Sequence, residues 1–149
     1  KMETKIPPPI VTLIFGLSIY FSRGIFQVVE IKYSFYFGIL LLVLGFVILI
    51  SAVRLFRKDK TTVNPLSPEQ ATTLVTDGIF KYSRNPMYLG MALVLGSIAV
   101  FFNIIGGIIL VALFCAYITK FQIFPEERAM RDLFSDDFDK YTKVTRRWI

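Results

Sequence analysis

Two long stretches of this chain carry no charged residue, and they constrain its fold more than any other feature. No charge occurs between Lys32 and Arg54, and none occurs between Arg84 and Lys120. A helix needs about 20 predominantly apolar residues to cross the hydrocarbon core of a bilayer. Only 19% of all residues are charged and 54% are hydrophobic, whereas a soluble domain has about 25% charged residues. The stretches therefore predict membrane-spanning helices.

Turn signals divide the apolar sequence into segments. Asn103 interrupts the second stretch, and Gly106 and Gly107 follow at once, which favours a tight helical hairpin. We expect an all-α polytopic membrane protein with one domain, residues 1–149, and about four transmembrane helices. The expected spans are residues 6–22, 33–56, 86–102 and 104–124, with a loop at 57–85 and a tail at 125–149 that forms an amphipathic helix.

The basic residues predict the orientation of these spans. The net charge is +6, yet its Lys and Arg residues gather at the ends of apolar runs, which favours contact with lipid head groups over nucleic acid. Of 17 basic residues, only Arg23 and Lys32 lie between the first two spans and none lies in the hairpin turn. The positive-inside rule then places both termini, the 57–85 loop and any active site on the cytoplasmic face of the cell membrane.

Two scarce residue types narrow the possible chemistry. The chain has no histidine and a single cysteine, Cys115. These counts exclude histidine-assisted nucleophiles, histidine metal sites and four-cysteine zinc sites. We expect no metal.

Local signals predict order outside the spans. Ser67, Pro68 and Gln70 have the spacing of a capped helix start, so we expect a short helix that runs to about Val75. In the tail, apolar residues recur every three or four positions and predict one apolar helix face. They are Met130, Leu133, Phe134, Phe138, Tyr141, Val144 and Trp148.

Two clusters could carry chemistry. The first is the aromatic, basic and glycine-bearing run at residues 78–90, which includes Arg84 and Asn85 and otherwise fits an ordinary interfacial belt of Tyr and Arg. The second is Glu126 with Glu127, which otherwise fit helix-dipole capping and an i,i+4 pair with Arg131.

The hairpin brings the two clusters together, because both lie at its open end. Carboxylates attract ammonium or sulfonium, a guanidinium holds carboxylate, and aromatic faces favour a desolvated cation. The combination suits a zwitterionic ligand with a cationic centre.

The order and spacing of both clusters resemble a known family. The pattern is Leu74-x-x-x-Gly78-x-Phe80-x-x-x-Arg84-Asn85-Pro86-x-Tyr88-x-Gly90, followed by Glu126-Glu127 and Phe134-x-x-x-Phe138-x-x-Tyr141. It resembles the isoprenylcysteine carboxyl methyltransferase and phospholipid methyltransferase superfamily of integral membrane enzymes, from about residue 64 to the C-terminus.

This resemblance implies methyl transfer from S-adenosylmethionine to a lipophilic acceptor, without a Rossmann domain. Membrane lipids are the expected surroundings, and a lipid or lipophilic small molecule is the expected partner. The implied cofactor contacts are Thr72, Thr73, Leu74, Val75, Phe80, Asn85, Pro86, Met87, Tyr88 and Glu126. The expected catalytic residues are Glu126, Glu127, Tyr88 and Arg84.

Two positions depart from the family pattern. Asn85 stands where the family usually has histidine, so this site cannot titrate. Gln122 stands where the carboxyl methyltransferases have an arginine for the substrate carboxylate, which argues against a prenylcysteine substrate. Gln122 and Arg128 are nevertheless the expected acceptor-binding residues.

Two other functions are compatible with the composition. One is a non-catalytic assembly subunit that retains the family fold. The other is a small four-span transporter of cationic compounds, which usually needs an ionisable group within the membrane. The spans contain no acidic residue.

Overall fold

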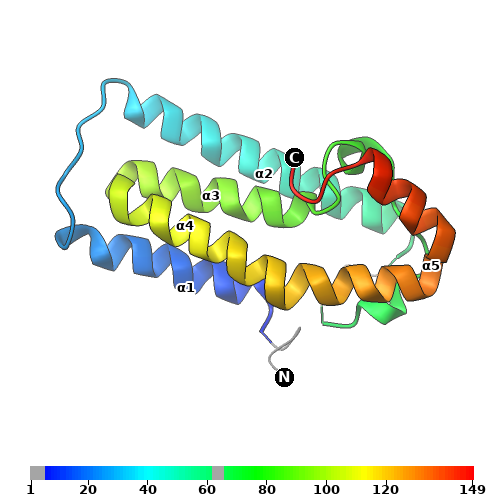
Figure 1. Ribbon diagram of the computed structural model, residues 1–149. Helices are drawn as coiled ribbons and strands as arrows, with labels where there is room; N and C mark the ends of the chain where they lie inside the picture. The colour runs from blue at the N-terminus through cyan, green and yellow to red at the C-terminus, as the bar shows by residue number, and fades with distance from the viewer. Residues whose placement is uncertain (1–5, 62–65) are drawn as a thin grey trace.

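The computed structural model describes residues 6–61 and 66–149, and its long elements are five α-helices, of which the first four lie lengthwise beside one another and the fifth continues from the end of the fourth (Figure 1). They are α1 (Pro8–Phe21), α2 (Ser34–Lys58), α3 (Pro86–Phe102), α4 (Ile104–Ile118) and α5 (Phe124–Val144). Short 3₁₀ turns occur at Ser22–Gly24, Pro68–Gln70 and Gly78–Lys81. The all-α prediction is confirmed, and the four apolar runs form helices close to their expected limits.

The predicted hairpin is tight because one residue makes the turn. Asn103 separates α3 from α4, and its side-chain carbonyl accepts a hydrogen bond from the Gly106 amide at 3.0 Å. Its amide group donates to the Ser22 hydroxyl at 3.1 Å and so ties the turn to the end of α1. One side chain therefore caps α4 and fixes the position of α1.

Glycine lets α2 pack closely on α3. Gly45 and Gly90 face each other, and a Cβ added to Gly90 would lie 2.8 Å from the Gly45 carbonyl oxygen. A side chain at either position would push the two backbones apart. This close contact explains why residue 90, two positions after Tyr88 in the first turns of α3, is a glycine.

Two helices of the described chain are long and apolar enough to cross a membrane. They are α2 and the continuous helical stretch Ile104–Val144, of which the apolar part belongs to α4. The α1 helix has 14 residues, which rise only about 21 Å. Phe35, Val43 and Val47 on α2 remain more than half exposed, an arrangement that suits contact with lipid.

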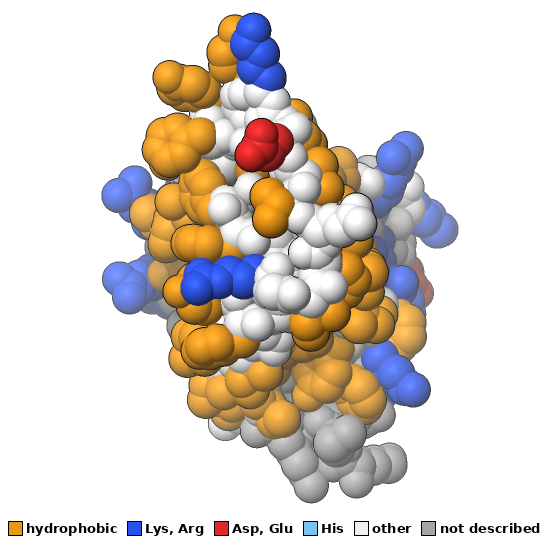
Figure 2. Space-filling model, turned by 90° about the vertical axis from the view of Figure 1, so that its left-hand side faces the viewer, with side chains coloured by type: hydrophobic (Ala, Val, Ile, Leu, Met, Phe, Trp, Pro, Cys, Tyr) orange, Lys and Arg blue, Asp and Glu red, His pale blue; other side chains and the backbone are white. Residues whose placement is uncertain are grey.

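Figure 2 views the molecule from the end that carries the α3–α4 turn. Hydrophobic side chains cover much of this end, and charged side chains are sparse on it. The sparse charge agrees with the uneven distribution of Lys and Arg along the sequence.

A π-helical segment, Thr119–Ile123, joins α4 to α5 without a break. Halfway along α5 the chain turns back, because Ser135 has a φ of 38° and a ψ of −112°. The expected single apolar face of the tail is therefore divided. Phe138 and Tyr141 are buried, whereas Val144 is 80% exposed. The return half of α5, residues 136–144, folds over the end of the bundle (Figure 1).

The expected helix from Ser67 to Val75 is wrong. Only Pro68–Gln70 form a 3₁₀ turn, and the Ser67 side chain caps nothing. Ala71 is extended, with φ −64° and ψ 129°. The segment that follows lies against α5 and the end of α2 instead of forming its own backbone hydrogen bonds, so tertiary packing outweighs the local capping signal.

Candidate active site

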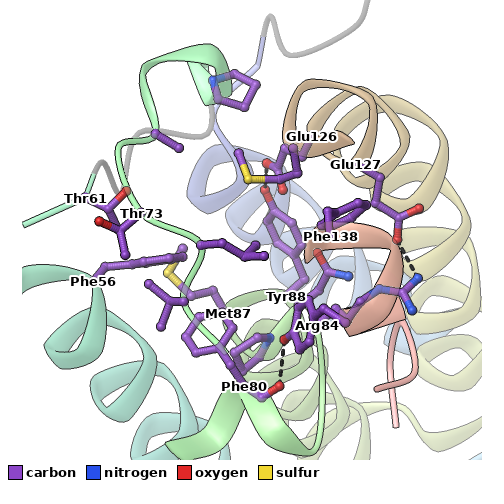
Figure 3. Close-up of a pocket in the computed structure, with 18 residues that line it drawn as sticks. Phe56, Thr61, Thr73, Phe80, Arg84, Met87, Tyr88, Glu126, Glu127 and Phe138 are labelled. Carbon is purple, nitrogen blue, oxygen red and sulfur yellow. Dashed lines mark hydrogen bonds and ion pairs between the residues drawn. The ribbon is translucent and has the colours of Figure 1, made fainter. Parts of the chain in front are cut away.

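A cleft opens where the end of α2, the loop before α3 and the two halves of α5 meet (Figure 3). Its empty space, counted out to its solvent-filled mouth, is about 840 Å³. Apolar residues form most of its wall, and they are Phe56, Pro68, Ala71, Leu74, Val75, Phe80, Pro86, Met87, Met130 and Phe138. Such a cleft, with few polar groups, is typical of small-molecule sites.

The polar end of the cleft carries a carboxyl and phenol pair. Pro86 begins α3, which places Tyr88 on its first turn, and Pro125 lies in the first turn of α5 beside Glu126. The Tyr88 hydroxyl donates a short hydrogen bond to the Glu126 carboxylate. Both groups also line the cleft. Two helices far apart in sequence thus supply one acidic pair.

The environment of Glu126 favours its protonated form. The pKa of this carboxyl group is raised from 4.5 to about 8, chiefly because burial disfavours the charged form; the Tyr88 hydrogen bond lowers the pKa and the charge of Glu127 raises it. Glu126 lies beyond the apolar part of α4, at the polar end of the bundle. A carboxyl group with a pKa near neutrality can accept or hold a proton under physiological conditions.

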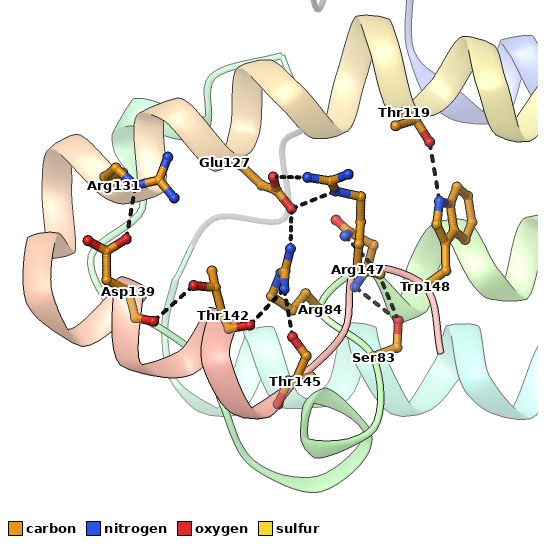
Figure 4. A network of polar contacts seen from close by, with 11 residues as sticks. Ser83, Arg84, Thr119, Glu127, Arg131, Asp139, Thr142, Thr145, Arg147 and Trp148 are labelled. Carbon is orange, nitrogen blue, oxygen red and sulfur yellow. Dashed lines mark hydrogen bonds and ion pairs between the residues drawn. The ribbon is translucent and has the colours of Figure 1, made fainter.

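Glu127 has the opposite environment. Arg147 binds both of its carboxylate oxygens, with Nε to Oε1 at 3.0 Å and Nη2 to Oε2 at 2.9 Å, and Arg84 Nη2 lies 2.8 Å from Oε1 (Figure 4). Burial raises the pKa of Glu127, but the hydrogen bonds and charges of the two arginines outweigh it and hold the pKa below its usual range. We call Arg84, Glu127 and Arg147 the clamp.

The clamp fastens the end of the chain beside the cleft. Arg84 Nη1 donates to the Thr145 carbonyl at 2.6 Å, and the Asn85 side-chain amide donates to the Arg147 carbonyl at 2.9 Å. The Tyr141 hydroxyl donates to the Phe80 carbonyl at 2.6 Å. Residues 145–149, which we call the C-terminal segment, are therefore held against the loop that enters α3 (Figure 4).

Most of the expected cofactor contacts do line the cleft. Thr73, Leu74, Val75, Phe80, Asn85, Pro86, Met87, Tyr88 and Glu126 are all on its wall, as are Arg84 and Glu127. Thr72 is not among the lining residues, and its hydroxyl donates to the Lys60 carbonyl at 3.2 Å. Figure 3 shows Thr61 and Thr73 at the opposite end of the cleft from Glu126.

The two expected acceptor-binding residues lie elsewhere. Gln122 is 1% exposed and its amide donates to the Ile6 carbonyl at 2.8 Å. Arg128 lines a separate shallow groove with Lys120 and Phe124. Gln122 lies four positions before Glu126, within the π-helical segment. A π-helix has an extra residue per turn compared with an α-helix, so Gln122 and Glu126 do not share the helix face that lines the cleft.

The alternative pairing of Glu127 with Arg131 does not occur. Arg131 instead binds Asp139 at 3.0 Å across the turn at Ser135. The predicted i,i+4 pair does not form, because Arg84 and Arg147, which are both distant in sequence, bind Glu127 instead.

Sequence reasoning missed several residues of the site. Phe56 and Met130 line the cleft, and Arg147 completes the clamp. Arg147 lies 20 positions after Glu127. This separation is far longer than the three or four residues that bring helical side chains together, so no local pattern predicts the pair. Among the described residues, no group of three His, Cys, Asp or Glu side chains is placed to hold a metal ion.

Comparison with known proteins gives one match. The family described as phospholipid methyltransferase matches residues 33–137, more than two thirds of the chain. No curated protein and no solved structure matches the chain significantly. The matched region contains α2, the loop, α3, α4 and the first half of α5, which together form most of the cleft. With its apolar helices, this membrane protein belongs to the phospholipid methyltransferase family, as its motifs indicate.

Proposed function

We propose that the protein transfers a methyl group from S-adenosylmethionine to a lipophilic acceptor at the membrane surface. The observation that supports this most directly is the cleft with the Glu126 and Tyr88 pair at its polar end, within the region that matches a methyltransferase family. The family alone leaves the cofactor and the acceptor open, so the proposal depends on the chemistry of the cleft.

The side chains that line the cleft fit the chemical groups of S-adenosylmethionine. Glu126 offers a carboxylate to a positively charged group, and Phe56, Phe80 and Phe138 offer faces for adenine and for a desolvated sulfonium. Arg84 also lines the cleft, and its buried Nε has no hydrogen-bond partner among the described residues. That atom leaves one donor for the carboxylate of the ligand.

When bound, S-adenosylmethionine would supply an activated methyl group on a sulfonium. The chain's own contribution is alignment in a site with little water, which can be worth about 7–11 kcal/mol when the geometry is good. An amine acceptor must also lose a proton, and Glu126, supported by Tyr88, is the base within the cleft. Glu127 acts beside it by holding Arg84.

The acceptor would enter from the bilayer. Phe56 lies near the end of α2, whose apolar surface is exposed, and it also lines the cleft. We propose four spans with the cleft and both termini on the cytoplasmic face, in line with the positions of Lys and Arg. A lipid could then present its reactive group to the cleft while its chains remain in the membrane.

Calorimetric titration with S-adenosylmethionine tests the proposal. Purified protein in detergent at pH 8.5, above the pKa of Glu126, should bind the cofactor with a micromolar dissociation constant. The E126Q variant removes the charge and should bind at least about tenfold more weakly, since a hydrogen bond to a charged group is worth about 1.5–3 kcal/mol.

Glu30, an exposed residue at the far end of the molecule, provides the matched control. The E30Q variant should bind like the wild type. Equal binding by E126Q would contradict the assignment, and absence of binding by the wild type would favour a non-catalytic assembly subunit. Labelled methyl transfer into a membrane lipid extract would then identify the acceptor.

A further inference from the structure

Arg147 lies outside the region that matches the family, which ends at residue 137. It is nevertheless the residue that binds both oxygens of Glu127. A bidentate pair of this kind fixes orientation as well as charge. The C-terminal segment therefore orients the Glu127 carboxylate, which is directly beside Glu126 in sequence.

A continuous series of contacts leads from Arg147 to the cleft wall. Glu127 binds Arg84, and Arg84 donates to the carbonyls of Thr145 at 2.6 Å and Thr142 at 3.4 Å. Thr142 follows Tyr141, which lines the cleft and is 7% exposed. The clamp thus links the first half of α5 to its return half, which carries Phe138 and Tyr141.

Arg147 is the outermost member of the clamp. Its side chain is 37% exposed, against 11% for Arg84 and 16% for Glu127. Without Arg147, Glu127 Oε2 loses the one charged partner that it has in residues 6–61 and 66–149, and the carboxylate can rotate toward solvent. The Arg84 guanidinium would then lose the fixed acceptor that orients its contacts with the return half of α5.

We propose that Arg147 is a positioning residue that builds the cofactor cleft by docking the C-terminal segment and the return half of α5 against the family core. This inference rests on the proposed function only in naming the ligand of the cleft. The docking itself is a property of the free protein.

The single tryptophan of the chain reports on docking without any ligand. Trp148 follows Arg147, is partly buried, and donates from its indole nitrogen to the Thr119 hydroxyl at 3.2 Å (Figure 4). If Arg147 docks the segment, the R147M variant should show red-shifted Trp148 emission and stronger quenching by acrylamide. The measurement uses the full chain in detergent or nanodiscs.

Affinity for S-adenosylmethionine is measured on the same samples. R147M should bind about tenfold more weakly or worse, since Arg84, which the proposed function assigns to the ligand carboxylate, loses its fixed acceptor, and a lost charge-assisted hydrogen bond weakens binding about tenfold or more. R147K keeps the charge but not the two-point geometry, so it should give an intermediate affinity and intermediate quenching.

Arg146 supplies a matched control next in sequence. Its side chain is exposed, and only its backbone carbonyl contacts Arg84. R146M should behave like the wild type in both measurements.

Unchanged Trp148 quenching in R147M would overturn the docking role. Increased quenching with unchanged affinity would overturn the link to the cleft. A wild-type protein that did not bind S-adenosylmethionine would instead contradict the proposed function, and the quenching comparison would still decide whether Arg147 docks the segment.

Discussion

Glu126 and Glu127 are neighbours in sequence and both line the cleft, yet their carboxyl groups lie in two different surroundings. Glu126 lies in the cleft beside a phenol, and burial raises its pKa to about 8. Glu127 lies in the clamp between two guanidinium groups, which hold its pKa below the usual range. Adjacent acids whose pKa values are moved apart have different tasks. Here one is available for chemistry and the other holds the structure.

The difference arises from the direction in which each side chain leaves α5. Successive residues on a helix point about 100° apart, so one carboxylate faces α3 and the cleft while the next faces the C-terminal segment. The clamp uses both arginines that reach this end of the cleft. Among the described residues, no cation pairs with Glu126, which favours binding of a positively charged ligand.

The largest expected effect comes from breaking the clamp. E127Q leaves the Arg84 guanidinium, 11% exposed, without an anionic partner in the described part of the chain, and removing one member of a buried ion pair costs about 3–5 kcal/mol. Thermal or denaturant unfolding in detergent should show this loss, whereas E126Q should cost much less. The double variant R84M/E127M should be more stable than E127Q, because the charge that it leaves unpaired, the Arg147 guanidinium, is 37% exposed and can be solvated. Equal stability of E127Q and E126Q would contradict the distinction between the two acids.

The second effect is a dependence of stability on pH that differs in sign between the two acids. The folded-state pKa of Glu126 lies above the 4.5 of an ordinary glutamate, so its contribution to the free energy of unfolding declines as pH rises from about 4.5 to about 8. The pKa of Glu127 is lowered, so its contribution is complete above its ordinary pKa and is lost as pH falls below it.

Unfolding temperatures measured from pH 4 to 9 separate these contributions. E126Q should remove the decline toward pH 8, and E127Q should remove the loss at acidic pH. A decline toward pH 8 that persists in E126Q would show that another group causes it.

A smaller effect is expected from Y88F. Tyr88 lowers the pKa of Glu126 through its hydrogen bond, so removing the hydroxyl should move the midpoint of the pH dependence to higher pH. A hydrogen bond to a charged group contributes about 1.5–3 kcal/mol. Without it, more of Glu126 is protonated at pH 8.5, and cofactor binding should weaken about tenfold or more. Tyr82 is exposed on the same loop, and Y82F serves as the matched control. An unchanged midpoint in Y88F would contradict the pairing.

The smallest effect should come from a surface pair on the return half of α5. Asp137 and Lys140 lie 3.5 Å apart, with 79% and 75% of their side chains exposed. Solvent screens such pairs, so D137N should change stability by no more than about 0.5 kcal/mol. A loss as large as that of E127Q would show that exposure does not distinguish the clamp from ordinary ion pairs.

The sequence by itself determined the helical class, the limits of the apolar segments and the family. Uncharged runs of membrane length must form helices, because backbone groups in lipid have no other partners. Local signals were also sufficient at Asn103 and Pro86, where a cap and a fixed φ begin helices. The motif at residues 78–90 and the two glutamates identified eight of the 18 residues that line the cleft, since both lie at the open end of the hairpin.

Only the tertiary structure decided which groups those residues meet. The positive φ of Ser135 returns α5 over the cleft, and a serine in that conformation has no reliable sequence signal. The π-helical segment changes the direction of Gln122, and packing replaces the expected helix after Ser67 with an extended segment. The division of labour between Glu126 and Glu127 depends on Tyr88, Arg84 and Arg147. Burial and distant partners set the properties of a charged group, and neither is encoded in its neighbours along the chain.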